Sequence, residues 1–455
     1  MVADSVKLTG EDIEELKQLG EAHFWPHSRP IGDMSDETGI KLISKAEGVW
    51  VEDGEGNRWV DTLAGMWLKN IGHGRKEIAE AVYQQMQDVS YSPGGTVSPA
   101  TVRLAAKVAS LSPDPDSRVY FVSGGSEAVE TALKIAKAYH KNNGEPTRYK
   151  VISRRGSYHG ATHACMALGG SAASGPQDYG PLVPGNIHIA QPNKYRGPHT
   201  DIECAEELER TILHEGPHTV AAFIGEPISA AAGIHIPDSG YWPRIREICD
   251  KYGVIMICDE VITGFGRTGK MFATEHWDIQ PDIFTVAKAL TSGYLPIGAA
   301  VASKKVADNF MGQDNMLRHL ITFGGNPASC AAGLANLEIM ENEDVVQNSA
   351  EMGDYLYEQL QTLYEHPIVG DVRGGMGLIC GIEIVKDRDT KERFPAEANL
   401  GPILDKLMSD HGLLGRAGDV IALSPPLTIT RDEVDFVVRQ LDSVLEQAEA
   451  QLGAE

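Results

Sequence analysis

The chain has 455 residues, of which 42% are hydrophobic, and a formal net charge of -24 at pH 7. This length suits two domains, or one large domain with an appended lobe, and the apolar content can furnish a sizeable core. The strong negative charge argues against nucleic acid or an anionic membrane surface as the main partner.

The six cysteines are widely scattered and form no CxxC pair, which favours reduced thiols over a disulfide framework or a zinc site. The first residues lack the basic and apolar regions of a signal peptide. Nowhere do about 18 apolar residues run together, as a membrane-spanning helix requires. We therefore expect a soluble, cytoplasmic protein.

In chain order, the first predicted element is a β-hairpin at residues 48–61 that turns at residues 53–57. Short apolar runs then alternate with helical patterns, which predicts a mainly parallel sheet. The candidate strands are residues 118–122, 150–153, 220–224, 254–258, 283–286 and 297–302, and helical spacing marks residues 126–140 and 241–251. We expect an α/β fold with a large domain at 63–335 and a small α+β domain built from both termini, residues 1–62 and 336–455.

Lys288 and Asp259 each end an apolar run, 29 residues apart. In a parallel sheet, ligands collect beyond the carboxyl ends of strands, so both side chains can meet at one ligand. A lysine amine can form a Schiff base with an aldehyde, and a buried carboxylate can keep a pyridine nitrogen protonated. The pair therefore predicts a pyridoxal-phosphate site.

Simpler interpretations compete with this one. Lys288 can be a surface lysine, and Asp259 can be a helix N-cap or a metal ligand together with Glu260. No HExxH or clustered His/Asp pattern supports a metal, so we expect none.

Residues 123–128, Ser-Gly-Gly-Ser-Glu-Ala, lie between a predicted strand and a predicted helix. Glycines let a backbone approach an anion, and a helix start presents free N–H groups to a phosphate. Taken alone, this pattern is also an ordinary strand-to-helix turn. Three further candidates are just as ambiguous alone: the aromatic residue Tyr158 beside glycine, Glu226 after a strand, and Thr322 in a glycine turn.

Together these segments resemble the class III aminotransferases, a branch of the fold-type I pyridoxal-phosphate enzymes. The resemblance covers nearly the whole chain, and its most specific stretches are residues 123–134, 158–160, 257–269 and 287–298. It implies a fold-type I architecture, pyridoxal 5'-phosphate as cofactor, and an enzyme that moves an amino group between an amine and a keto acid.

The resemblance also implies roles for individual residues. Lys288 is expected to bind the cofactor covalently and to move the proton, while Asp259 pairs with the pyridinium nitrogen. Tyr158 is expected to stack on one face of the ring and Val261 to pack on the other. Glu226 would link site groups through hydrogen bonds.

The cofactor phosphate is expected to bind Gly125 and Ser126 of one subunit and Thr322 of its neighbour. This implies a homodimer with shared active sites, and pairing of dimers into a tetramer is left open. The chain departs from the family at Ser123 and Gly124, because the family often has Asn-Ser-Gly-Ser where this chain has Ser-Gly-Gly-Ser at residues 123–126.

Within the class, residues 64–68 and 412–427 most resemble the pyruvate-dependent ω-transaminases, which act on amines, diamines, polyamines, taurine or β-alanine. One site must then accept an amine and later a small keto acid. A mobile Arg416 could bind the keto-acid carboxylate and swing away for the amine. Without the resemblance, Arg416 would be a surface arginine in a glycine-flanked loop.

The same resemblance makes Trp67 and Tyr91 lining residues of the substrate pockets, with Ala231 leaving room beneath them. Without the resemblance, Trp67 and Tyr91 would be interpreted as core aromatic residues and Ala231 as an alanine in a helix. His27 and Ile321 stand where relatives often have phenylalanine, so amine preference cannot be copied from a relative.

Two other functions are kept as alternatives. One is a class III enzyme that uses 2-oxoglutarate, of the 4-aminobutyrate or ornithine type, or an aminomutase. The other is a non-catalytic protein that binds pyridoxal phosphate, against which the complete set of Lys288, Asp259 and phosphate residues speaks.

Overall fold

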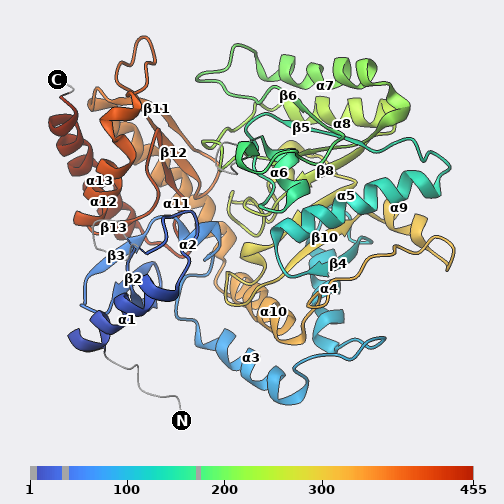
Figure 1. Ribbon diagram of the computed structural model, residues 1–455, viewed down its shortest axis with the longest axis horizontal. Coiled ribbons are helices and arrows are strands. Elements are labelled where there is room, and N and C mark those ends of the chain that lie inside the picture. The colour runs from blue at the N-terminus through green and yellow to red at the C-terminus, as the bar shows by residue number, and fades with distance from the viewer. Residues whose placement is uncertain (1–7, 33–39, 171–175, 454–455) are drawn as a thin grey trace.

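The computed structural model describes residues 8–32, 40–170 and 176–453. Two lobes lie side by side, one built around a large sheet and the other from the elements near both termini (Figure 1). In the described part of the chain, no helix has the length and apolar character needed to cross a membrane. The six cysteines are all buried and unpaired.

Seven strands form the large sheet, in the order β4-β10-β9-β8-β7-β5-β6. Its strands are β4 (Arg118–Val122), β5 (Lys150–Arg154), β6 (Asn186–Ile189), β7 (Val220–Gly225), β8 (Ile255–Asp259), β9 (Ile283–Val286) and β10 (Gly298–Ala302). The neighbours from β9 to β6 pair in parallel, whereas β10 is antiparallel to both β4 and β9. The predicted mainly parallel sheet is confirmed.

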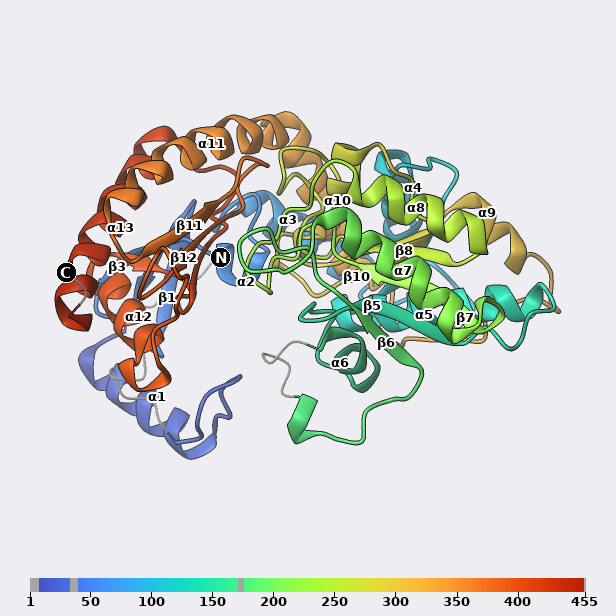
Figure 2. The same cartoon turned by 90° about the horizontal axis from the view of Figure 1, so that it is seen from above.

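Both faces of this sheet are covered, as the continuous apolar runs predict. Every residue of β7 and β8 is buried. Ile224 and Ile257 pack with Val129 of α5 (Gly125–Asn142), whereas Phe223 and Met256 lie in the other apolar cluster, with Trp242 of α8 (Tyr241–Tyr252). Helices α7 (Asp201–Glu215) and α8 lie together on that second face (Figure 2).

The second lobe joins the two ends of the chain. Strands β1 (Ile43–Glu47), β2 (Trp50–Asp53) and β3 (Arg58–Asp61) form a sheet with β13 (Leu413–Leu414), and β13 pairs in parallel with β3. The predicted hairpin is β2 and β3. A second sheet contains β11 (Val369–Arg373), β12 (Cys380–Ile384) and β14 (Val420–Leu423). The predicted small α+β domain from both termini is therefore confirmed.

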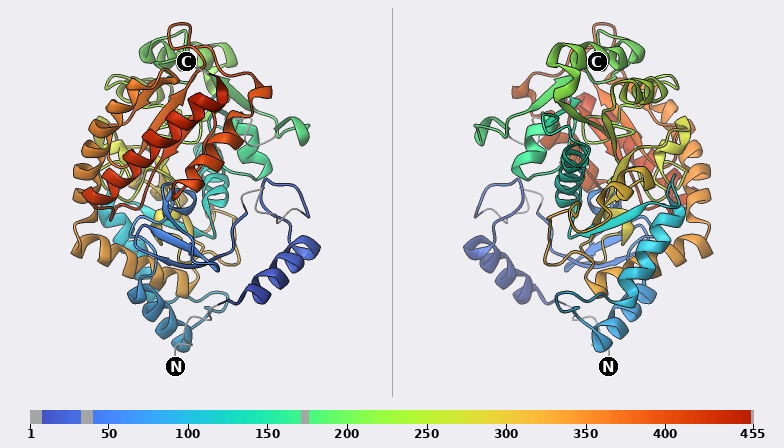
Figure 3. Two further views of the ribbon diagram at one scale, coloured as in Figure 1. Left: turned by 90° about the vertical axis from the view of Figure 1, so that its left-hand side faces the viewer. Right: turned by 90° about the vertical axis from the view of Figure 1, so that its right-hand side faces the viewer.

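The helices of this lobe are α1 (Gly10–His23), α11 (Val345–Leu360), α12 (Leu400–Asp410) and α13 (Arg431–Leu452). The C-terminal helices form the outer layer, and α1 lies at the margin of the lobe (Figure 3). The remaining helices are α2 (Ala64–Trp67), α3 (Lys76–Asp88), α4 (Pro99–Leu111), α6 (His163–Gly169), α9 (Lys304–Ala307) and α10 (Pro327–Asn342). The domain limits at 62/63 and 335/336 stay predictions, and α10 runs through the second limit as one helix.

Candidate active site

Lys288 and Asp259 lie at the carboxyl edge of the large sheet. Asp259 is the last residue of β8 and is in register with Thr285 of β9, and Lys288 follows two residues after β9 ends. Lys288 has a φ of 40°, an uncommon conformation for a residue with a side chain. Burial lowers the pKa of Lys288 to about 8, against the opposing influence of the nearby Asp259 charge. A lysine amine with a lowered pKa is a nucleophile and a proton acceptor near neutral pH.

Asp259 is held by three donors and is only 5% exposed. Its Oδ1 accepts hydrogen bonds from Thr285 Oγ1 at 3.0 Å and from Val261 N at 3.2 Å. Its Oδ2 lies 2.7 Å from His159 Nδ1. These three contacts fix the position of the Asp259 carboxylate.

His159 is fully buried between two carboxylates. Its Nε2 lies 3.8 Å from Glu226 Oε2, on the side of the ring opposite Asp259. Glu226 accepts hydrogen bonds from Arg154 Nη2 at 3.0 Å and from Tyr158 N at 3.1 Å. Although burial raises the pKa of Glu226, the charges of His159 and Arg154 outweigh it and lower that pKa overall. A buried line of polar side chains, Arg154–Glu226–His159–Asp259, thus lies behind Lys288 and Tyr158.

Neither Arg154 nor His159 was identified as a site residue from the sequence. His159 lies within the stretch 158–160 that carries the resemblance, but nothing in its spacing indicates contact with a residue 100 positions later. Arg154 directly follows the strand predicted at residues 150–153, where an arginine is usually solvated, yet it is the last residue of β5 and is fully buried.

The start of α5 lies beside Val261 and the residue before Lys288. A Cβ atom on Gly125 would lie 3.1 Å from Val261 Cγ1 and 3.8 Å from Ala287 Cβ, so glycine permits this approach. The N-cap Gly124 has no side-chain capping hydrogen bond, which leaves backbone N–H groups at the positive end of the helix dipole for an anion.

Ser126 joins this helix start to the segment after Tyr158. Its Oγ accepts a hydrogen bond from Ala161 N at 3.1 Å. Gly160 has a φ of 128°, and a Cβ atom there would lie 2.9 Å from Ser126 Cβ. Tyr158 is partly buried, and burial, with the nearby Cys165 and Asp259, raises its pKa. These residues fit pyridoxal phosphate, with an amine for the aldehyde, a carboxylate for the ring nitrogen and a helix start for the phosphate.

Thr322 lies apart from this group. Its carbonyl accepts a hydrogen bond from Tyr91 Oη at 2.9 Å, and Tyr91 meets the ring of Phe323 edge-on. Ile321 accepts a hydrogen bond from Gly324 N in the same turn. Thr322 is exposed, and among the described residues no hydrogen bond joins it to Gly125.

The other expected pocket residues lie in several environments. Trp67 is 4% exposed and belongs to the apolar core. Ala231 lies in the turn between Ser229 and His235 rather than in a helix, so the simpler interpretation of it was wrong. His27 is exposed in a turn near the N-terminus.

Arg416 is exposed in the loop between β13 and β14. Asp405 of α12 accepts a hydrogen bond from Ala417 N at 3.0 Å, directly after Arg416. Partial burial raises the pKa of Asp405, while the charges of Arg29 and Arg416 lower it. Two arginines from distant segments therefore lie near one carboxylate.

The Glu260 side chain forms hydrogen bonds with residues other than those that contact Asp259. Its buried carboxylate accepts hydrogen bonds from the Thr263 hydroxyl and from the backbone N–H groups of Ala273 and Thr274. Burial raises its pKa to about 7. Within residues 8–32, 40–170 and 176–453, no group of three or more His, Cys, Asp or Glu residues could hold a metal ion.

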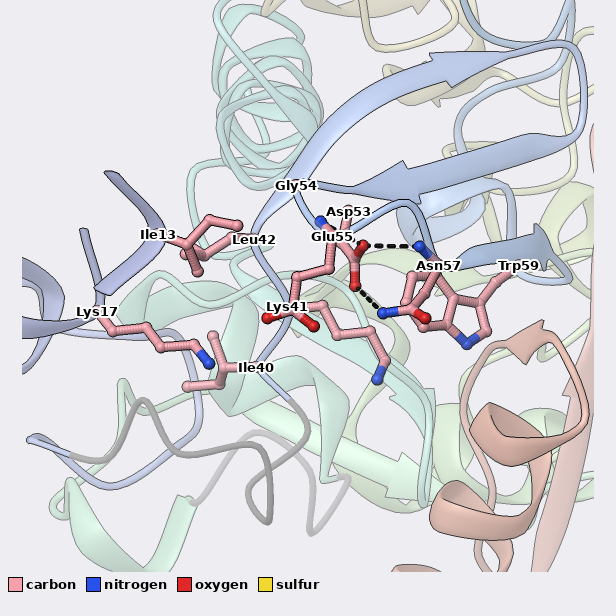
Figure 4. Close-up of a pocket in the computed structure, with 10 residues that line it drawn as sticks. All are labelled: Ile13, Lys17, Ile40, Lys41, Leu42, Asp53, Gly54, Glu55, Asn57 and Trp59. Atoms are coloured by element: carbon pink, nitrogen blue, oxygen red, sulfur yellow. Dashed lines mark hydrogen bonds between the residues drawn. The ribbon is translucent and has the colours of Figure 1, made fainter. Parts of the chain in front are cut away.

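A cavity of about 190 Å³ lies away from all these residues, between α1, residues 40–42 and the β2–β3 hairpin (Figure 4). Asp53 closes the hairpin turn through hydrogen bonds to Asn57. Lys41 covers the ring of Trp59, with its Nζ 4.5 Å from the ring centroid. None of the predicted site residues lines this cavity.

Comparison with known proteins agrees with the fold. The family model described as aminotransferase class-III matches residues 33–445. The chain is 37% identical to a putrescine–pyruvate aminotransferase of Pseudomonas aeruginosa, over 98% of both chains. It is 38% identical to a diaminobutyrate–2-oxoglutarate transaminase of Halomonas elongata, over 88% of this chain and 89% of that one.

Among solved structures, an (S)-enantioselective ω-transaminase from Thermomicrobium roseum matches with a TM-score of 0.90 and 42% identity, over 96% of this chain and 98% of that chain. Solved neighbours of the same fold hold pyridoxal phosphate or pyridoxamine phosphate. The match over most of the chain confirms the resemblance inferred from the motifs. This protein belongs to the class III aminotransferases and is an enzyme that depends on pyridoxal phosphate.

Proposed function

We propose that this enzyme is an ω-transaminase that transfers an amino group from a primary amine to pyruvate, giving a ketone or aldehyde and alanine. The exposed position of Arg416 in a glycine-flanked loop carries the proposal. A fixed, buried arginine would face the amine as an uncompensated charge, at a cost of several kcal/mol. An arginine on an exposed loop can bind a carboxylate and withdraw.

The proposed chemistry is divided among a few residues. Bound pyridoxal phosphate supplies an electron sink for the carbon from which a proton is removed. Lys288 anchors the cofactor and then removes and returns that proton at its Nζ, because burial leaves it a usable base near neutral pH. Asp259 pairs with the ring nitrogen, and the helix start at Gly125 and Ser126 binds the phosphate.

The remaining roles concern the edges of the site. Tyr158 and Val261 are proposed to hold the two faces of the ring, and Glu226 to fix Tyr158 through its backbone N–H. Trp67, Tyr91 and Ala231 are proposed to shape the amine pockets. His27 and Ile321 would modify their width and polarity.

We propose a homodimer, in which Thr322 reaches the phosphate site of the partner subunit. The surface around Thr322 supports this, because Tyr91, Phe323 and Leu320 are 47%, 62% and 81% exposed. Large apolar side chains gathered on one surface are typical of an interface. A cytoplasmic location is proposed as well, since the six cysteines are unpaired.

A second candidate function is transfer to 2-oxoglutarate, as in the diaminobutyrate transaminase relative. The position of Arg29 favours it, because Arg29 and Arg416 both act on Asp405. Two neighbouring arginines suit a keto acid with two carboxylates. Under this alternative, Arg29→Ala would raise the KM for 2-oxoglutarate and leave that for pyruvate unchanged.

Replacement of Lys288 tests the proposed chemistry. Lys288→Ala should lower turnover of an amine with pyruvate by more than about 100-fold, because the base is lost. The variant should still bind pyridoxal phosphate without a covalent bond, which equilibrium dialysis measures. Turnover equal to that of the unsubstituted enzyme would refute the role of Lys288.

A further inference from the structure

The segment that carries Trp67 leaves β3 in an unusual backbone conformation. Ala64, Gly65 and Trp67 have φ angles of 47°, 68° and 64°. These values lie in the left-handed region, which residues with side chains rarely adopt. Such conformations persist only where the surroundings hold them, and they gather at functional sites.

One buried carboxylate holds this segment. Asp61 is the last residue of β3 and is 3% exposed. Its Oδ2 accepts a hydrogen bond from Gly65 N at 2.6 Å, and its Oδ1 accepts one from Leu63 N at 3.3 Å. The ring of His73 adds a third contact, with Nε2 at 2.8 Å from Asp61 Oδ2. Asp61 thus ties the start of the loop to His73, which lies beyond its end.

The loop rests directly on the turn that follows Lys288. A Cβ atom on Gly293 would lie only 1.9 Å from Leu68 Cδ1, so Leu68 packs onto the bare glycine. Gly293 N in turn donates a hydrogen bond to Lys288 O at 3.2 Å. The position of residues 63–68 is therefore coupled mechanically to the backbone of Lys288.

A second bond fixes the chain just after this loop to the same turn. Ile71 N donates to Ser292 Oγ at 3.3 Å, and Ser292 Oγ donates to Asn336 Oδ1 at 2.6 Å. Both contacts therefore anchor the C-terminal end of the loop to the turn after Lys288. At the other end, the Asp61 carboxylate accepts from Leu63 N and from Gly65 N, which is one of the left-handed residues. Trp67 N donates to the backbone oxygen of the same Leu63.

We propose that Asp61, with His73 as its partner, is a positioning residue that fixes the wall of the amine pocket formed by Trp67. This inference rests on the proposed function, which assigns Trp67 to that pocket. A loop held in one conformation sets one pocket width, so it discriminates among amines by size. When Asp61 is replaced, Leu63 N and Gly65 N lose their side-chain acceptor. The pocket wall that bulkier amines contact is then no longer held in one conformation.

Three variants of the cofactor-loaded enzyme test the inference. Asp61→Ala removes every acceptor, whereas Asp61→Asn keeps one oxygen for Gly65 N, and His73→Gln keeps a donor toward Asp61. Asp201→Ala is the matched control, because Asp201 is also 3% exposed and accepts a backbone N–H, that of Asp238, at 2.6 Å. Hydrogen exchange of peptides spanning residues 63–69 is measured together with kinetics for 1-phenylethylamine and for isopropylamine, each with pyruvate.

For Asp61→Ala, we expect exchange of residues 63–69 to quicken by about tenfold, as loss of a hydrogen bond to a charged group predicts. The KM for 1-phenylethylamine should rise by about tenfold on the same basis, while the KM for isopropylamine and that for pyruvate change much less. Asp61→Asn and His73→Gln should each keep the exchange rate of residues 63–69 and the ratio of the two amine KM values close to those of the unsubstituted enzyme. Asp201→Ala should leave both the exchange of residues 63–69 and the ratio of the two amine KM values unchanged.

Unchanged exchange in Asp61→Ala would overturn the inference whatever the kinetics show. Faster exchange with equal changes for both amines would overturn the role in amine selection. If the unsubstituted enzyme converts no amine with pyruvate, the proposed function fails and the pocket role fails with it. The exchange rates would still decide whether Asp61 holds the loop.

Discussion

His159 Nδ1 lies 2.7 Å from Asp259 Oδ2, and the opposite nitrogen of the same ring faces Glu226. A single buried imidazole therefore separates two buried carboxylates. Removing one partner of a buried hydrogen bond costs about 1–3 kcal/mol, because the other polar group stays buried without a partner. The position of the Asp259 carboxylate thus depends on a residue that need not contact the cofactor.

His159→Phe should therefore weaken pyridoxal-phosphate binding by more than about tenfold and lower the midpoint of thermal unfolding. His140→Phe is the control, because His140 is also buried but bonds to a backbone carbonyl, that of Ala221, at 2.8 Å. That variant should lose stability while its cofactor affinity, measured by dialysis, stays within about threefold. Equal loss of affinity in both variants would show that His159 acts only through the fold.

Gly125→Ala should weaken cofactor binding by about tenfold, because its Cβ atom would press on Val261, and overpacking costs about 1–3 kcal/mol. Gly124→Ala is a matched control, since nothing lies within 4 Å of a Cβ atom at that neighbouring position. Titration of the cofactor-free protein with pyridoxal phosphate gives both affinities. A larger loss at Gly124 than at Gly125 would contradict the role given to Val261.

Incorporation of pyridoxal phosphate should become faster as the pH rises through about 8, the pKa of Lys288 in the folded protein. Below that pH the amine is protonated and does not attack an aldehyde, and above it the neutral amine predominates. Stopped-flow absorbance measures the rate between pH 6 and 10. A rate that still rises steeply at the upper end of this range, as the ordinary lysine pKa of 10.5 would require, would show that burial does not lower this pKa.

Arg416→Ala should lower kcat/KM in the pyruvate half-reaction by about 10- to 100-fold, because hydrogen bonds to a carboxylate are lost. The amine half-reaction should change by less than about threefold, and stability by less than about 0.5 kcal/mol, since Arg416 is exposed. Single-turnover absorbance follows each half separately. Arg416→Lys, which keeps the charge but not the paired geometry, should give an intermediate loss.

Much of the fold follows from local patterns. Six predicted strands occur within a residue or two of their expected limits, because fully buried strands require continuous apolar runs. The antiparallel direction of β10 could not be predicted, since an apolar run has no direction and pairing depends on the connection before it. Strand β6 was missed because only Ile189 of its four residues is fully buried.

The candidate site, like the fold, could be predicted from the sequence only in part. Lys288, Asp259 and Gly125 could be proposed from the sequence because each lies at or just after the end of a strand or at the start of a helix, and these positions often carry functional side chains. The contacts of His159 and Asp61 were not found, because they depend on side-chain directions across distant segments. The left-handed conformation of Trp67 was equally hidden, since tryptophan gives no sign of it in a sequence.

The most direct test of the proposed function follows the visible absorbance of the cofactor in the loaded enzyme as amines are added without any keto acid. We predict that diamines or 1-phenylethylamine abolish the absorbance of the bound aldehyde form, and that pyruvate restores it while 2-oxoglutarate does not. Recovery with 2-oxoglutarate alone would contradict the proposed acceptor and favour the second candidate function. Retention of the absorbance with every primary amine would contradict the assignment of amine donors.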